Sequence, residues 1–199
     1  MPFGGGSRCL PPTRAMHTAI GPNLFRAGVP SEHFEYYAAP SVAGRQRQSK
    51  WCWAASIQMA LNYHGLNVTQ EQIVQRVFGG MYDAPANLNQ ILYALTGWAP
   101  DTRGRFSTIH ATLYGLTPSQ LITDLSNNWP LIVGLRGWSI GHACVLTAVE
   151  YTRIMGGFPW LTKAIYRDPW PGHFSRHELL WAAFQLRTQY LIRVWVNRL

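Results

Sequence analysis

Apolar residues in the first part of the chain recur among polar residues in a pattern typical of helices. The stretch WCWAASIQMALNYHG at 51–65 contains the helix-forming residues Ala, Gln, Met and Leu, and Gly65 is suited to end the helix. Three further helices follow segments that suit helix N-termini: Thr69 with Gln72, Asn87 with Gln90, and Thr117 with Pro118 and Gln120. The second of the four helices should reach about Phe78.

The pattern then changes to short segments rich in β-branched and aromatic residues and bounded by Gly and Pro, which indicate strands. These segments are PLIVGLRGW at 130–138, HACVLTAVEY at 142–151, LTKAIYRD at 161–168 and QYLIRVWVNRL at 189–199. Between the last two, Ser175 and Glu178 predict a capping box for a helix within HELLWAAF at 177–184. Helices followed by mainly antiparallel strands predict an α+β fold, with a cleft between the two halves as a natural place for a site.

Residues 1–40 are rich in Gly and Pro and weakly periodic, so we expect an irregular lead-in or linker remnant before a domain at 41–199. No apolar run approaches the roughly 20 residues that a membrane-spanning helix needs. The N-terminal residues contain no apolar signal-peptide core. We therefore expect no membrane partner.

The composition is that of a globular protein, because 47% of the 199 residues are hydrophobic and 13% are aromatic. The net charge is +8, but the basic residues are scattered along the chain and no nucleic-acid-binding motif accompanies them. An ordinary basic surface is therefore favoured over nucleic-acid binding. An acidic protein partner would exploit the same field.

The chain has three cysteines, Cys9, Cys52 and Cys144, and no C-x-x-C motif, which fits folding in a reducing cytosol better than a disulfide framework or a zinc site. Cys52 lies at the expected start of the first long helix. A helix N-terminus and a nearby imidazolium are the two devices that turn a thiol, with its ordinary pKa of about 8.5, into a nucleophilic thiolate. Cys52 is thus a candidate nucleophile, although an isolated cysteine is more often a core residue.

His142 is the best-placed of the seven histidines, because it follows Gly141 at the beginning of a strand and can project into a cleft. Asp168 ends the next strand, and adjacent antiparallel strands would bring its carboxylate to the second ring nitrogen of His142. Asp168 could instead only form an Asp-Pro turn. The side-chain amide of Gln46, six residues before Cys52, could join the Cys52 backbone N–H in stabilising an oxyanion. Gln48 competes with Gln46 for that role.

These motifs together resemble the papain-like cysteine peptidases, most closely the bacterial C39-like and AvrRpt2-like branch. The matching elements are Gln46, CWAA at 52–55, GHA at 141–143 and DPWPG at 168–172, in the family's order and with gaps of 6, 90 and 26 residues. The resemblance covers about residues 45–196. Each motif alone is weak, whereas four in the right order are a strong signal.

The resemblance implies a papain-like fold and hydrolysis of peptide bonds in protein substrates, with Cys52, His142, Asp168 and Gln46 as the catalytic residues and no metal or organic cofactor. It also implies a bacterial effector or toxin that is made in the cytoplasm and delivered by a secretion system independent of a signal peptide. An acidic immunity or inhibitor protein would then be a partner. Processing of a double-glycine leader is less expected, because the domains that do so are fused to membrane transporters.

Other interpretations use the same residues differently. As a second choice, the Cys–His pair would serve an amidase, a deamidase or an acyltransferase, and a basic binding module could keep the fold without the chemistry. Cys144 is expected to pack in the core, and the His173–His177 spacing mimics a metal pair but favours a surface role. The sequence leaves open which of Trp51 and Trp53 shields the site.

Overall fold

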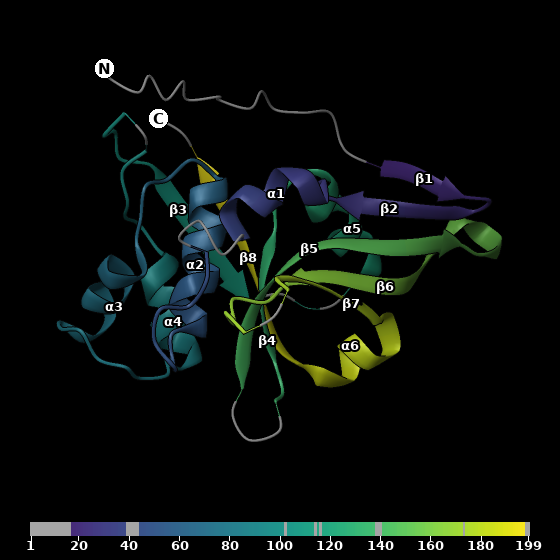
Figure 1. The fold of residues 1–199 in the computed structure, drawn as a ribbon. Coiled ribbons are helices and arrows are strands. Elements are labelled where there is room, and N and C mark those ends of the chain that lie inside the picture. The colour runs from purple at the N-terminus through teal and green to yellow at the C-terminus, as the bar shows by residue number, and fades with distance from the viewer. Residues whose placement is uncertain are drawn as a thin grey trace, which may run out of the picture.

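The computed structural model describes residues 17–38, 44–101, 103–113, 115, 117–137, 141–172 and 174–197. In these residues the chain forms helices on both sides of one curved antiparallel sheet (Figure 1). The helices are α1 (Ser31–Ala38), α2 (Cys52–Tyr63), α3 (Gln70–Phe78), α4 (Leu88–Leu95), α5 (Pro118–Ser126) and α6 (Trp181–Arg187), with a short 3-10 turn, η1 (Met155–Gly157). The predicted α+β class is confirmed.

The sheet runs in the order β1-β2-β5-β4-β8-β3, and β6 and β7 extend it from β5. Its strands are β1 (His17–Gly21), β2 (Leu24–Gly28), β3 (Thr108–Leu113), β4 (Leu131–Leu135), β5 (His142–Arg153), β6 (Pro159–Arg167), β7 (Arg176–Leu180) and β8 (Thr188–Asn197). The long strand β5 pairs with β4 near its start, with β2 near its end and with β6 on its other side. This strand therefore connects the parts of the molecule, and His142 is its first residue.

Both faces of the central strands are buried. Successive side chains point to opposite faces, so neighbouring residues of one strand pack in different cores. On β5, Ala143 packs in the core formed with α2, α3 and α4, whereas Cys144 packs in the core formed with α5 and α6. Ile132 and Val133 divide in the same way on β4. The expected core position of Cys144 is confirmed, since this residue is fully buried.

The predicted helix starts are confirmed where the signal is local. Thr69 with Gln72 forms a capping box before α3, and Asn87 with Gln90 forms another before α4. Helix α5 begins at Pro118 as expected, but the hydroxyl of Thr117 donates to Oε1 of Gln120 instead of capping the backbone. None of the helices in the described residues has the length and apolarity needed to cross a membrane.

The expectation of irregular structure is wrong for residues 17–38, which form β1, β2 and α1. Strand β2 pairs with β5, and the buried guanidinium of Arg167 at the end of β6 forms an ion pair with Glu35 and donates to the Ser31 carbonyl at 2.9 Å. These stabilising contacts come from residues far along the chain, which local periodicity does not reveal. The domain boundary at residue 41 stays a prediction.

The helix expected within 177–184 is also partly wrong. Residues 176–180 form β7, and α6 begins only at Trp181. Glu178 makes no capping box, because its carboxylate pairs across the sheet with Lys163 on β6 at 2.8 Å. Strand β3 was not predicted.

Candidate active site

Cys52 is the first residue of α2 and is half-buried. Trp51 is the N-cap residue and makes no side-chain cap, so no N-cap side chain accepts from the N–H groups of the first helical turn. The N–H groups of a first helical turn and the helix dipole both favour an anion at this end. The position suits a cysteine that must ionise to react.

Both tryptophans beside Cys52 anchor the start of α2 to the loop before α4. The indole of Trp51 donates to the Tyr82 carbonyl at 2.8 Å, and that of Trp53 donates to the Ala84 carbonyl at 3.1 Å. Both side chains are buried. The sequence left open which tryptophan shields the site. In the structure, both tryptophans instead attach the start of α2 to this loop.

Asp83 completes this attachment from the same loop. Its carboxylate accepts from the hydroxyl of Ser49 at 2.6 Å and from the backbone N–H of Lys50 at 2.8 Å. These hydrogen bonds, led by the one from Ser49, hold the pKa of Asp83 below its usual value. Sequence reasoning missed Asp83, because nothing in its local pattern points to a partner 33 residues away.

His142 and Asp168 form the pair that the strand order predicted. Arg167, the last residue of β6, pairs with Val145 of β5, which brings the next residue, Asp168, beside the start of β5. The imidazole Nε2 of His142 lies 2.7 Å from Oδ1 of Asp168. The side chains remain 27% and 14% exposed, so the pair faces an opening and not the closed core.

The loop that contains Asp168 is itself fixed. The backbone N–H of Trp170 donates to Oδ1 of Asp168 at 2.7 Å, and the Asp168 backbone N–H donates to the Ser175 carbonyl at 2.8 Å. Arg45 donates to the Asp168 carbonyl at 2.7 Å. Burial alone would raise the pKa of Asp168, but the hydrogen bond and charge of His142 outweigh it and lower that pKa.

The charge state of His142 follows from its neighbours. Burial alone would lower its pKa, whereas hydrogen bonds with Asp168, Cys144 and Cys52 raise it to about 12. These contacts favour the imidazolium form of the ring. An imidazolium in contact with the Cys52 thiol is the second device that stabilises a thiolate.

Gln46 is buried beside the site, whereas its competitor Gln48 is exposed. The backbone N–H of Gln46 donates to the Pro169 carbonyl at 2.8 Å, so its loop is joined to the loop of Asp168. Its side-chain amide donates to the carbonyls of Gln48 and Ser49, both at 3.0 Å. One of these bonds must open before the amide can contact an oxyanion, so that role stays a prediction.

Gln70 fixes the loop that contains Gln46. This fully buried residue begins α3, and its amide donates to the Arg45 carbonyl at 2.7 Å while its carbonyl oxygen accepts from the Arg47 backbone N–H at 3.1 Å. The two residues that flank Gln46 are thus attached to one side chain. In the sequence, a glutamine directly after the Thr69 cap indicates only the start of a helix, and nothing points to its contacts with Arg45 and Arg47.

Tyr190 is a further neighbour of the site that sequence reasoning missed. It packs against the core beside Cys52, and its ring covers Gly134, where a Cβ would lie 2.2 Å from the ring. Burial, together with the nearby thiols of Cys52 and Cys144, raises the pKa of its phenol. A tyrosine in a strand is too common to indicate this proximity.

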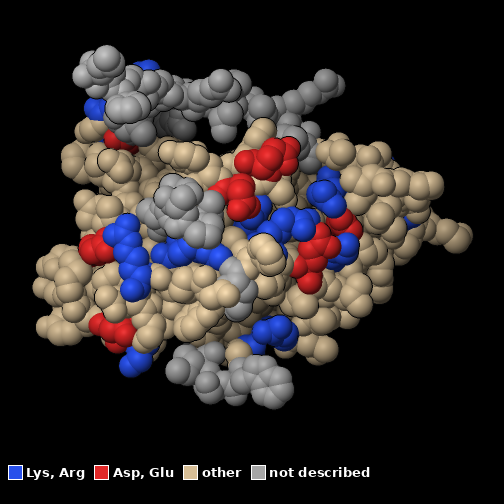
Figure 2. All heavy atoms as spheres, viewed as in Figure 1, with Lys and Arg blue, Asp and Glu red and all other residues tan. Residues whose placement is uncertain are grey.

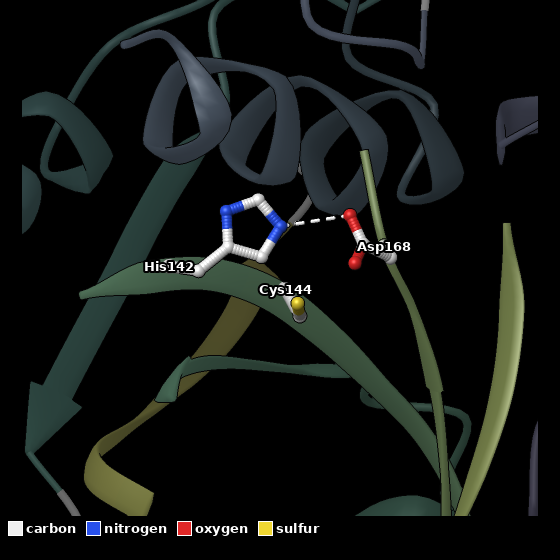
Figure 3. A group of neighbouring side chains, drawn as sticks. All are labelled: His142, Cys144 and Asp168. Carbon is white, nitrogen blue, oxygen red and sulfur yellow. Dashed lines mark hydrogen bonds and ion pairs between the residues drawn. The ribbon is translucent and has the colours of Figure 1, made fainter. Parts of the chain in front are cut away.

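Cys144 lies beside the His142–Asp168 pair (Figure 3). Burial raises the pKa of its thiol to about 11, so it is a neutral thiol at neutral pH. The surface role expected for His173 and His177 stays a prediction for His173, because His173 lies outside the described residues. His177 stacks on Tyr166 with ring centroids 5.5 Å apart.

The structure thus brings Cys52, His142 and Asp168 together and places Gln46 in the loop that adjoins them. Comparison with solved structures finds the peptidase domain of Streptococcus ComA, described as a bifunctional ABC transporter in quorum sensing, at 14% identity and a TM-score of 0.53 over 78% of this chain and 96% of that one. A double-glycine-motif protease from an AMS/PCAT transporter, solved with a leader peptide, is similar at 22% identity and a TM-score of 0.47 over 78% and 89% of the two chains.

A search of curated proteins gave no match. The sequence model of the Peptidase_C39 like family matches residues 40–193, which is most of the chain and includes all four predicted site residues. The first solved structure agrees with this match in fold. The chain therefore belongs to the Peptidase_C39 like family and is a papain-like cysteine peptidase.

Proposed function

We propose that the protein cleaves peptide bonds in protein substrates through a triad of Cys52, His142 and Asp168, with Gln46 assisting at the oxyanion. The observation that carries the proposal is the contact of one imidazole with both the Asp168 carboxylate, at 2.7 Å, and the thiol of the residue that begins α2. The match to a peptidase family supports the same chemistry.

The reaction begins when the Cys52 thiolate attacks the carbonyl carbon of the scissile bond. The resulting oxyanion is stabilised by the Cys52 backbone N–H and by the Gln46 amide, once that amide releases a loop carbonyl. His142 then protonates the leaving amine and a thioester remains. Neutral His142 next takes a proton from water, which hydrolyses the thioester and restores the ion pair.

Asp168 orients the ring in both half-reactions. Its carboxylate accepts from Nε2, which leaves Nδ1 as the nitrogen that exchanges protons with the thiol and the leaving group. Trp170 and Arg45 hold Asp168 itself through hydrogen bonds, so the ring is oriented by a fixed group.

The test compares new protein N-termini in a cell extract incubated with the wild type or with Cys52→Ala. We expect termini that only the wild type produces, and their flanking residues would define the cleavage motif. Ammonia release without new termini would favour a deamidase instead. Cross-linked amines would favour an acyltransferase, and muropeptide fragments a peptidoglycan amidase.

We further propose that the protein is a bacterial effector or toxin, delivered by a secretion system independent of a signal peptide and restrained in its producer by an acidic inhibitor protein. The support is the resemblance to delivered peptidases and the net charge of +8. On the face shown in Figure 2, acidic side chains lie among the basic ones. The carboxylate of Glu150, for example, forms ion pairs with both Arg26 and Lys163. A partner that carries charges of both signs, such as a protein, complements this mixed surface better than the uniformly negative phosphate backbone of a nucleic acid.

Expression of the wild type inside cells should be toxic and expression of Cys52→Ala harmless. An acidic protein encoded beside this one should relieve the toxicity and protect Cys52 from alkylation. If the active wild type is harmless, the toxin proposal fails while the peptidase assignment stands.

A further inference from the structure

A second thiol, which the proposed mechanism does not use, lies at the catalytic histidine. His142, Cys144 and Asp168 each offer one potential metal ligand, and these atoms lie within 4.8 Å of one another. In Figure 3 the imidazole and the carboxylate are turned toward each other, and the sulfur of Cys144 lies beside them. His142 and Cys144 come from β5, and Asp168 follows β6, so paired strands fix the group.

The combination of ligands selects the type of metal ion. Thiolate and imidazole are the preferred ligands of Zn²⁺, whereas Mg²⁺ and Ca²⁺ prefer oxygen ligands. Zinc bonds of about 2.0–2.3 Å place neighbouring ligand atoms roughly 3.3–3.7 Å apart. The three atoms therefore need to move by only on the order of 1 Å, with the His142–Asp168 contact opening slightly.

Access and charge also fit a divalent cation. The exposed fractions of His142 and Asp168, 27% and 14%, leave an entrance, and Cys144 lies behind them, fully buried. With thiolate, carboxylate and neutral imidazole as ligands, the bound ion is neutralised, which a partly buried site requires. One coordination position of a tetrahedral ion remains for water.

We infer that His142, Cys144 and Asp168 form an inhibitory zinc site within the active site. Binding releases two protons to solvent, one from Nε2 of the imidazolium and one from the Cys144 thiol, and no electrons are transferred. With zinc on Nε2, Nδ1 keeps its proton, because losing that proton would leave a zinc-bound imidazolate. The ring can then neither accept a proton from Cys52 nor readily give one to the leaving amine. The inhibition rests on the proposed function, whereas the binding does not.

Binding is tested without catalysis, in Cys52→Ala. Co²⁺, used as a spectroscopic substitute for Zn²⁺, should give a thiolate-to-metal charge-transfer band in this variant, and added Zn²⁺ should remove the band. The band should be absent from the matched variant Cys52→Ala/Cys144→Ala, which retains Cys9. A missing band in Cys52→Ala, or the same band in both variants, would overturn the inference.

Inhibition is tested in the enzyme with Cys52 intact. Cys144→Ala should keep its peptidase activity, because the hydrogen bond with Asp168, the largest influence that raises the pKa of His142, remains. The Zn²⁺ concentration needed for half-inhibition should rise by about tenfold or more, since even a supporting residue of a metal site contributes that much. Mg²⁺ and Ca²⁺ should not inhibit, and a chelator should restore the zinc-treated wild type. Cys144→Ser, which keeps the side-chain volume, should match Cys144→Ala if both unfold at the wild-type temperature. Equal zinc sensitivity of the wild type and these variants would refute a role for Cys144.

Discussion

The Nε2 atom of His142 donates a hydrogen bond at 2.7 Å to Asp168, which lies 26 positions later in the chain. The contact exists because β5 and β6 are antiparallel neighbours whose register brings the residue after Arg167 to the start of β5. It keeps the imidazole charged and directs Nδ1 away from the carboxylate. The sheet register thus brings together the two groups whose contact raises the pKa of His142, the residue that faces the proposed nucleophile, Cys52.

Replacement of Cys52 by alanine should abolish peptidase activity, with a loss of several orders of magnitude in kcat/KM, as loss of a catalytic nucleophile causes. The fold should survive, because Cys52 is only half-buried and alanine suits a helix start. The measurement is hydrolysis of a peptide that carries the identified cleavage motif. Cys144→Ala is the matched control, and if Cys144→Ala alone were inactive, the assignment of the nucleophile would be wrong.

Asp168→Asn should shift the pH dependence of activity. The hydrogen bond with Asp168 is the largest influence that raises the pKa of His142. Replacing the Asp168 carboxylate by a neutral amide should therefore lower the pKa of His142 toward its ordinary value. The imidazolium is then lost at lower pH, and the alkaline limb of the kcat/KM profile should move to lower pH. The loss at neutral pH should be smaller than in His142→Ala, which forfeits the full general acid–base contribution of about 10²–10⁴. An unchanged alkaline limb would reduce Asp168 to a turn residue.

Gln46→Ala tests the oxyanion role. If its amide turns to the oxyanion, kcat should fall by about 10²-fold with little change in KM, as for other oxyanion donors. Gln48→Ala is the matched control, because Gln48 lies in the same loop but is exposed. A fall in thermal stability with unchanged kcat would mean that the Gln46 amide only closes the loop onto the carbonyls of Gln48 and Ser49.

Features that depend on neighbouring residues were predictable from the sequence. The capping boxes of Thr69 and Asn87 join residues three apart, so the sequence contains both partners. Ser175 and Glu178 have the same spacing but form no cap, because the exposed edge of β6 offers backbone pairing to 176–180 and Lys163 offers a charge to Glu178. Local signals therefore fail where a sheet edge competes with a helix start.

In the candidate site, too, positions set by local structure were predictable, whereas contacts between elements were not. Cys52, His142 and Asp168 occupy positions that secondary structure alone predicts, at a helix start, a strand start and a strand end. Asp83, Gln70 and Tyr190 contribute only through contacts that cross from one element to another. Their residue types are common in loops, helix starts and strands, so nothing local distinguishes them.

Loss of Asp83 should slow catalysis without disturbing the core. Asp83→Ala removes the acceptor of Ser49 and Lys50, so the segment before Cys52 loses part of its attachment. Small misplacement of a nucleophile lowers rates strongly, and we expect about a tenfold fall in kcat/KM. Asp101→Ala is the control, because Asp101 is also a loop aspartate, but its carboxylate accepts from Arg103 and Arg105. Equal activities of the two variants would show that the Trp51 and Trp53 anchors suffice.

The ion pair between Glu35 and Arg167 should attach α1 to the peptidase domain. Arg167 is fully buried, so Glu35→Gln leaves its guanidinium without a charged partner, although the Ser31 carbonyl still accepts from it. Removal of one member of a fully buried ion pair lowers the free energy of unfolding by about 3–5 kcal/mol. Because the carboxylate of Glu35 is half-exposed, we expect Glu35→Gln to lower it by only about 1–3 kcal/mol.

Urea unfolding of Glu35→Gln measures this loss, with Glu32→Gln as the matched control on the exposed face of the same helix. A single transition that moves to lower urea in Glu35→Gln, and stays in place in Glu32→Gln, would mean that residues 31–38 unfold together with the sheet. An unchanged midpoint in Glu35→Gln would contradict the expectation, because α1 would then contribute nothing to the stability of the domain that holds Asp168 beside His142.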